Sequence, residues 1–215
     1  MSGRPQHPTR AEMEDWDRDP RMVNVALGFP LERELVEGEC VRCVVPEHRG
    51  EGSVVRRGDG PFVYRCTCDK IPRSLPEVYI GRVTGVRRRH SMQDFILWHI
   101  RQAAMGKLIA LPPVLMPPLP ERCSEVVRSC YGGLKVMLRC RQLTALRDEG
   151  DFAFSRRSAA EWSGLSSINL GKDAIEGLIR LGILVVELGP VSVLVVEKKR
   201  YLPATRYRLG PGRTW

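Results

Sequence analysis

The chain has 215 residues, 34 Lys or Arg against 25 Asp or Glu, and a formal net charge of +9; this length is typical of one large or two small domains. No run approaches the ~18 apolar residues that a membrane-spanning helix needs, which excludes membrane insertion. Residues 11–39 carry nine acidic and three basic side chains, whereas residues 82–107 and 197–215 each carry six basic against one acidic. Such basic patches indicate a polyanionic partner, most often nucleic acid, or otherwise a solvated basic surface.

Residues 1–20 are polar, contain early prolines and begin an acidic run, so we expect them to be disordered. They lack the apolar core of a signal peptide, and we therefore expect a cytoplasmic protein, in which disulfides are rare. The next segment, residues 22–37, has apolar residues at helical spacing and is interrupted at Gly28 and Pro30. It predicts a short helical lead-in to the residues that follow.

Five potential metal ligands lie in a polar, glycine-rich stretch: Cys40, Cys43, His48, Cys66 and Cys68. Zinc takes four sulfur or nitrogen ligands in a tetrahedron, often from two short turns that a β-hairpin brings together. Seventeen residues separate His48 from Cys66, and their pattern indicates a strand at 53–55, an Asp-Gly turn and a strand at 62–64. The pattern predicts a small zinc-ribbon domain over residues 21–86.

The chain thus offers five candidate ligands for the four coordination positions of a zinc ion. Cys40 and Cys43 have the spacing of a zinc knuckle, whereas Cys66 and Cys68 have only one residue between them. If His48 binds the ion, Cys40 is left over; if Cys40 binds, His48 is a surface histidine. Disulfides, or cysteines that are close by chance, are the alternatives to a metal.

The segment from residue 71 to 86 is short and punctuated by glycine and proline. A basic region and a helix are expected over residues 87–111, because Ser91 followed by Asp94 is typical of a helix N-terminus. Residues 112–120 contain five prolines in nine positions. They predict a stiff, extended linker to a second domain.

The second domain is predicted over residues 121–215. Apolar spacings of three and four indicate a long helix from 121 to about 147. A short helix is expected after an N-cap at Ser155, and a third helix over residues 167–181. The cysteines of the long helix are expected to be core residues, and they are Cys123, Cys130 and Cys140.

Three strands are predicted after the third helix, at residues 183–187, 191–197 and 204–209. Helix, helix, turn, helix and β-ribbon is the order of a winged helix-turn-helix domain, in which the third helix enters the major groove. The expected fold class is therefore α+β, with a small zinc ribbon, a helical linker and a winged helix.

Basic side chains on these elements are the candidate DNA contacts. They are Arg56, Arg57 and Arg65 on the hairpin, Arg156 and Arg157 on the second helix, Lys172 on the third, and Lys198, Lys199, Arg200, Arg206 and Arg208 on the ribbon. Phe62 and Tyr64 are expected to stack on the bases of single-stranded DNA. The third helix also carries Asp173 and Glu176, so docking of a replication or transcription protein is the alternative.

The residues Cys43-Val-Val-Pro-Glu-His48, a hairpin and Arg65-Cys66-Thr-Cys68 together resemble the zinc-binding domain of bacterial DNA primases, in the variant found in replication proteins of actinobacterial mobile elements and phages. Val44 stands where that family has proline, and the second cysteine pair is one residue shorter. Tyr131–Cys140 and Phe154–Leu165 are also similar to the winged-helix segment of those proteins. The resemblance implies a role in replication initiation or priming and favours His48 as a ligand.

Primer synthesis is not implied, because polymerisation needs carboxylates that hold Mg²⁺, and the sequence offers neither such a cluster nor a phosphate-binding glycine loop. Residues 148–151 are acidic by composition and are expected to be a solvated loop. A cysteine-rich ligand set closes a zinc site, whereas a hydrolytic zinc centre keeps one position open. We therefore expect a noncatalytic, zinc-dependent DNA-binding protein, or alternatively an adaptor or transcription regulator whose winged helix docks another protein.

Overall fold

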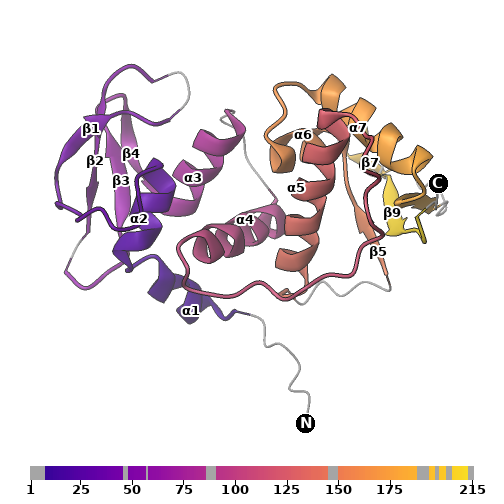
Figure 1. Ribbon diagram of the computed structural model, residues 1–215. Coiled ribbons are helices and arrows are strands. Elements are labelled where there is room, and N and C mark those ends of the chain that lie inside the picture. The colour runs from indigo at the N-terminus through magenta and orange to yellow at the C-terminus, as the bar shows by residue number, and fades with distance from the viewer. Residues whose placement is uncertain are drawn as a thin grey trace, which may run out of the picture. The chain divides into compact units, whose positions relative to one another are not determined.

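The computed structural model describes residues 8–45, 48–56, 58–85, 91–144, 150–187, 194–196, 199–201 and 205–212, without the side chains of 69–70, 194–196 and 199–201. Over these residues the fold is α+β, with helices and small antiparallel sheets (Figure 1). The chain divides into two compact units. The first consists of Met1–Pro112 with Cys140–Ala145, and the second of Pro113–Arg139 with Leu146–Trp215.

A four-stranded antiparallel sheet belongs to the first unit. In spatial order its strands are β1 (Cys40–Arg42), β2 (Glu51–Val55), β3 (Val63–Cys66) and β4 (Asp69–Ser74). Strands β2 and β3 pair with Val54 opposite Tyr64, which confirms the hairpin expected between the two groups of ligands. Val54 and Tyr64 are 3% and 0% exposed, so this face of the hairpin is buried and its side chains fix the pairing register.

The helices of the first unit are α1 (Arg10–Trp16), α2 (Pro20–Leu27), α3 (Leu75–Thr84) and α4 (Met92–Met105). Helix α4 begins where the sequence predicted, because the Ser91 side chain accepts the backbone N–H of Asp94. Helix α3 and most of strand β4 lie in residues 71–86, for which the sequence indicated no element. The α3 guanidinium of Arg82 donates to the carbonyl oxygens of Ala26 and Val25, at 3.0 and 2.9 Å, and so satisfies the end of α2.

Helix α1 lies within the segment that composition predicted to be disordered, of which residues 1–7 are outside the described part. A capping box of Thr9 and Glu12 starts the helix, and Asp17 anchors its end. The Asp17 Oδ1 atom lies 3.1 Å from Nε2 of His99 on α4, and its backbone carbonyl accepts the N–H of Phe62 at 2.9 Å. His99 is 3% exposed. Contacts with distant residues therefore order a segment whose own composition buries little apolar surface.

The helices of the second unit are α5 (Glu125–Arg141), α6 (Arg156–Ser163) and α7 (Ile168–Arg180). Glycines let these helices approach closely. A Cβ added at Gly171 of α7 would lie 2.2 Å from the carbonyl oxygen of Arg156 on α6, and one at Gly177 would lie 2.4 Å from Cγ2 of Val127 on α5. Cys130 and Cys140 are fully buried, as expected of core cysteines, whereas Cys123 lies before α5 and is partly exposed.

The strands of the second unit are β5 (Asp151–Ala153), β6 (Leu184–Glu187), β7 (Leu194–Val196), β8 (Lys199–Tyr201) and β9 (Arg206–Leu209). They form a three-stranded antiparallel sheet in the order β5-β9-β6 and a separate β7-β8 pair. The sequence predicted three strands here and missed β5 and β8. Asp151, expected in a solvated loop, instead begins β5 and binds Arg206 at 2.5 Å; residues 145–149 lie outside the described part.

The proline-rich segment after Pro112 belongs to the second unit. It is held there by the Tyr131 hydroxyl, which donates to the carbonyl oxygen of Pro117 at 2.9 Å. The chain beside Gly212 also packs on it, because a Cβ at that glycine would lie 2.7 Å from Cβ of Pro117. The segment expected to be a linker is thus extended and packed on its own unit for part of its length.

Candidate metal centre and nucleic-acid interface

Three of the five predicted metal ligands converge in the first unit. Cys43 follows strand β1, His48 lies in the connection from β1 to β2, and Cys66 ends β3. The backbone N–H of Cys43 donates to the carbonyl oxygen of Gly50 at 2.9 Å. This bond joins the two ends of the connection that carries Cys43 and His48.

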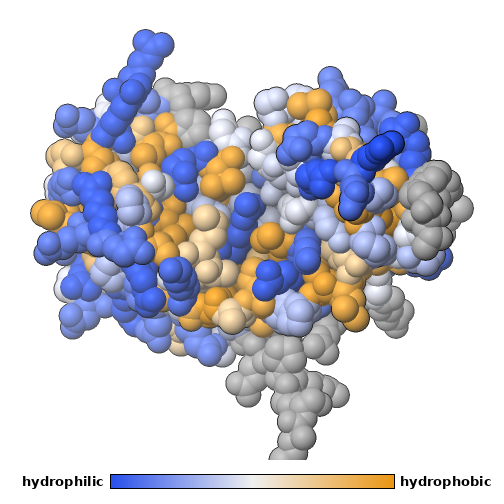
Figure 2. Space-filling model, viewed as in Figure 1, coloured by the Kyte–Doolittle hydropathy of each residue, from blue (hydrophilic) through white to orange (hydrophobic). Residues whose placement is uncertain are grey.

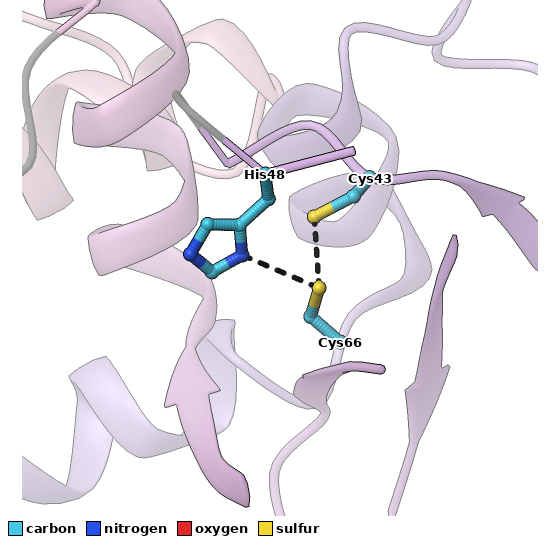
Figure 3. Close-up of side chains that lie close together, drawn as sticks. All are labelled: Cys43, His48 and Cys66. Atoms are coloured by element: carbon cyan, nitrogen blue, oxygen red, sulfur yellow. Dashed lines mark hydrogen bonds between the residues drawn. The ribbon is translucent and has the colours of Figure 1, made fainter. Parts of the chain in front are cut away.

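The ligand atoms of Cys43, His48 and Cys66 all lie within 4.8 Å of one another, and Figure 3 shows the three side chains pointing toward a common centre. The two sulfur atoms are 3.0 Å apart, and Nδ1 of His48 is 3.3 Å from Sγ of Cys66. Cys43 and Cys66 are 9% and 6% exposed. Among the described residues this is the one group of three or more potential ligands.

Sulfur and imidazole nitrogen are the donors that zinc prefers, so the chemistry of this group fits that ion. In a zinc tetrahedron two thiolate sulfurs, each about 2.3 Å from the metal, lie about 3.8 Å apart. The sulfurs of Cys43 and Cys66 need to separate by less than about 1 Å to reach that spacing. Burial raises the pKa of the Cys66 thiol to about 12, and its hydrogen bond with Cys43 adds to the shift.

Cys68 lies beside the group of three, and Cys40 does not. The Sγ atom of Cys68 accepts the backbone N–H of Gly50 at 3.2 Å, and the Cys68 N–H donates to Sγ of Cys66 at 3.3 Å. Its hydrogen bond with the Cys66 side chain lowers the pKa of the Cys68 thiol. Cys40 is exposed on β1 opposite Ser53, one register position from Gly52, the partner of Cys66. Because successive side chains of a strand alternate between faces, Cys40 is on the opposite face of the sheet from Cys66.

Tyr64 contacts the loop that begins at Cys43, a contact that the sequence analysis did not predict. Its hydroxyl oxygen accepts the backbone N–H of Val44 at 3.3 Å. Burial, with the Cys43 contact second, raises the pKa of Tyr64. The available signal was strand alternation, which puts Tyr64 on the same face as Cys66 two residues later.

The expectation that Phe62 and Tyr64 stack on DNA bases does not hold in this structure. The two rings are 4% and 0% exposed, so neither presents a face to solvent. The guanidinium of Arg56 lies 5.0 Å from the ring centroid of Phe62. Phe62 and Tyr64 therefore pack in the core of the first unit, where they bury a large apolar area.

The predicted DNA contacts of the hairpin have different surroundings. Arg65 is exposed on β3. The Nε atom of Arg56 lies 3.8 Å from a carboxylate oxygen of Glu37, and the two side chains are 38% and 46% exposed. Arg57 lies outside the described residues. Arg65 is thus the more available of the two described cations.

In the second unit, Arg156 and Arg157 are exposed in the first turn of α6. Three other predicted contacts form ion pairs: Lys172 with Glu176 at 3.7 Å, Arg206 with Asp151 at 2.5 Å, and Arg208 with Glu187. Lys199 and Arg200 lie in β8 without described side chains, and Lys198 is outside the described residues. Figure 2 shows hydrophilic residues predominating over α6 and α7, with small hydrophobic patches between them.

Comparison of the chain with models of known protein families, with curated proteins and with solved structures finds no match. The chemistry of the residues above therefore carries the functional argument. In the part of the chain that the structure describes, no helix combines the length and the apolar character needed to cross a membrane.

Proposed function

We propose that the chain is a zinc-dependent DNA-binding protein that acts without catalysis in the initiation or priming of replication. The observation that carries this proposal is the convergence of Cys43, His48 and Cys66 at the end of a β-hairpin. Two short ligand-bearing turns joined by a hairpin make a zinc ribbon, in which the ion contributes directly to folding.

Cys68 is the fourth ligand in this proposal, and Cys40 is not a ligand. The backbone N–H of Cys68 donates to Sγ of Cys66, and Sγ of Cys68 accepts a backbone N–H from the loop that carries His48. Backbone N–H groups that point at sulfur favour the thiolate, which is the form that binds metal. Cys40, in contrast, is exposed, and its thiol donates to the carbonyl oxygen of Gly38 at 4.0 Å.

The element order of the second unit supports the DNA-binding part of the proposal. Helix α5, strand β5, helices α6 and α7, and the strands β6 and β9 follow in the order of a winged helix-turn-helix domain. Only four residues, Gly164–Ser167, connect α6 to α7, which is the short turn that this motif requires. In such domains phosphate contacts commonly come from residues at the start of the second helix, where Arg156 and Arg157 are exposed.

Metal analysis of two serine variants tests the zinc site. Protein purified without added zinc is expected to hold one equivalent, as is Cys40→Ser, whereas Cys68→Ser is expected to hold less and to bind it more weakly. Cysteine thiolates are ligands only when deprotonated, so the measurement is made at a fixed pH. A chain that binds no zinc, with its hairpin intact after chelation, would refute the proposal. Loss of zinc from Cys40→Ser alone would instead reverse the ligand assignment.

DNA binding measured across a range of salt concentrations tests the second unit. Each phosphate contact contributes about −0.9 to the slope of log affinity against log salt for duplex DNA. The double variant Arg156→Ala with Arg157→Ala should therefore flatten that slope by about 2. A matched control that loses the same charge, Arg10→Ala with Arg18→Ala in the acidic α1 segment, should leave the slope unchanged.

An adaptor role is the second candidate, and the ion pairs of the second unit favour it. Lys172, Arg206 and Arg208 each face a carboxylate, so their charge is partly neutralised before any phosphate arrives. Asp173 and Glu176 are exposed on α7, where a DNA-reading helix would meet a polyanion. Under this reading the winged helix docks a replication or transcription protein. A salt slope near zero for the unmodified chain is the result that selects this candidate.

A further inference from the structure

We propose that Tyr64 is a positioning residue of the metal centre: its hydroxyl accepts the backbone N–H of Val44 and so holds the Cys43 loop in the geometry that binds the ion. This inference rests on the proposed zinc site and adds to it a residue that does not touch the metal. It assigns to Tyr64 a role different from the DNA stacking that its place on the hairpin first indicated.

The position of the Tyr64 hydroxyl is fixed from three sides. The side chain is fully buried, and its oxygen accepts the N–H of Val44, the residue directly after Cys43, at 3.3 Å. Gly52, on the neighbouring strand β2, leaves the space that the hydroxyl occupies, because a Cβ there would lie 1.9 Å from the hydroxyl oxygen. Glycine at position 52 therefore leaves room for the Tyr64 ring to reach the loop that begins at Cys43.

The hydroxyl acts on the loop through its backbone. A tyrosine oxygen has lone pairs that accept hydrogen bonds, and the Val44 N–H fills one of them at 3.3 Å. This bond fixes the backbone directly after Cys43 and so orients the side chain of that ligand. Outer-shell bonds that orient ligands typically change metal affinity by about 10-fold to 100-fold.

The test is the substitution Tyr64→Phe, which removes only the hydroxyl. Its matched control is Tyr79→Phe, because Tyr79 is also fully buried in the first unit and its hydroxyl contacts the Met105 sulfur at 2.9 Å, away from the ligands. Zinc dissociation constants are measured by competition with a chromophoric chelator. We expect affinity about 10-fold or more weaker for Tyr64→Phe and unchanged for Tyr79→Phe.

Cobalt substitution separates positioning from a purely structural role. In the cobalt-loaded protein, displacement of the Cys43 sulfur after the bond to the Val44 N–H is lost should shift the sulfur-to-metal charge-transfer band, a change that lower stability alone does not cause. If Tyr64→Phe is unfolded without metal, the titration remains valid because zinc binding then drives folding. The cobalt band of the loaded variant still decides the outcome.

The outcomes distinguish this inference from the proposed function. If the unmodified chain binds zinc, but Tyr64→Phe binds it equally well and its cobalt band is unchanged, only the role of Tyr64 is overturned. Weaker zinc binding with an unchanged cobalt band also overturns it, since the hydroxyl then acts through stability alone. If the unmodified chain binds neither metal, the zinc site itself is refuted and this inference falls with it.

Discussion

Replacing Gly171 with alanine should destabilise the second unit, although alanine is the better helix former. A Cβ at this position of α7 would lie 2.2 Å from the carbonyl oxygen of Arg156, 3.0 Å from the backbone nitrogen of Ala160 and 3.2 Å from the carbonyl carbon of Arg156. All three are backbone atoms of α6, so no side-chain rotation can relieve the overlap. The two helices must move apart, which opens gaps elsewhere in their interface.

The magnitude follows from two opposing effects. Overpacking in a well-packed core typically costs about 1–3 kcal/mol, and contact with rigid backbone places this site toward the upper end. The higher helix propensity of alanine offsets about 0.5–1 kcal/mol of this loss of stability. The net loss is expected to be about 1–2 kcal/mol.

Gly132→Ala provides the matched control. Gly132 is also inside a helix of the second unit, α5, but is exposed and has nothing within 4 Å of the added Cβ. Here only the helix preference remains, so the variant should be more stable by about 0.5–1 kcal/mol. Urea unfolding of both full-length variants measures the difference. Equal effects in the two variants, or stabilisation by Gly171→Ala, would refute the argument that close approach of α6 and α7 requires glycine.

Two further predictions concern the first unit, and both are read from urea unfolding. Asp17→Ala leaves the buried His99 without its carboxylate partner and should lower the free energy of unfolding by about 1–3 kcal/mol. The control Asp15→Ala removes only an exposed ion pair and should change that free energy by about 0.5 kcal/mol or less. Similar losses of stability in both variants would exclude a special role for Asp17. Arg82→Met keeps an unbranched side chain but removes both hydrogen bonds to the end of α2, and should cost about 1–3 kcal/mol. An unchanged midpoint would show that water replaces the guanidinium there.

Local signals in the sequence predicted the elements that local chemistry determines. The hairpin between the ligand groups has alternating side chains and a turn, and the starts of α4 and α6 carry serine N-caps at Ser91 and Ser155. Helix α3 was missed even though Ser74 and Glu77 form a capping box, because its glycine and proline drew the interpretation toward a loop. That signal was present and readable.

Other features depend on contacts that a single sequence does not reveal. Strand β5 has three residues and owes its assignment to pairing with β9. Gly171 and Gly177 lie where another helix approaches α7, a contact that the sequence alone does not show. For the metal site, cysteine spacing predicted the ligand group, but the sheet register was needed to separate Cys68 from Cys40.

The contacts of Asp17 link the acidic N-terminal segment to two distant parts of the first unit. Asp17 joins the end of α1 to Phe62, the residue before the strand that ends in Cys66, and to the buried His99 of α4. A proteolytic cut just after α1, or a shortened chain that starts at α2, would release this joint while leaving Cys43, His48 and Cys66 in place. Versions of the protein trimmed at the N-terminus are then expected to carry a looser hairpin and to bind zinc at the proposed site more weakly than the 215-residue chain.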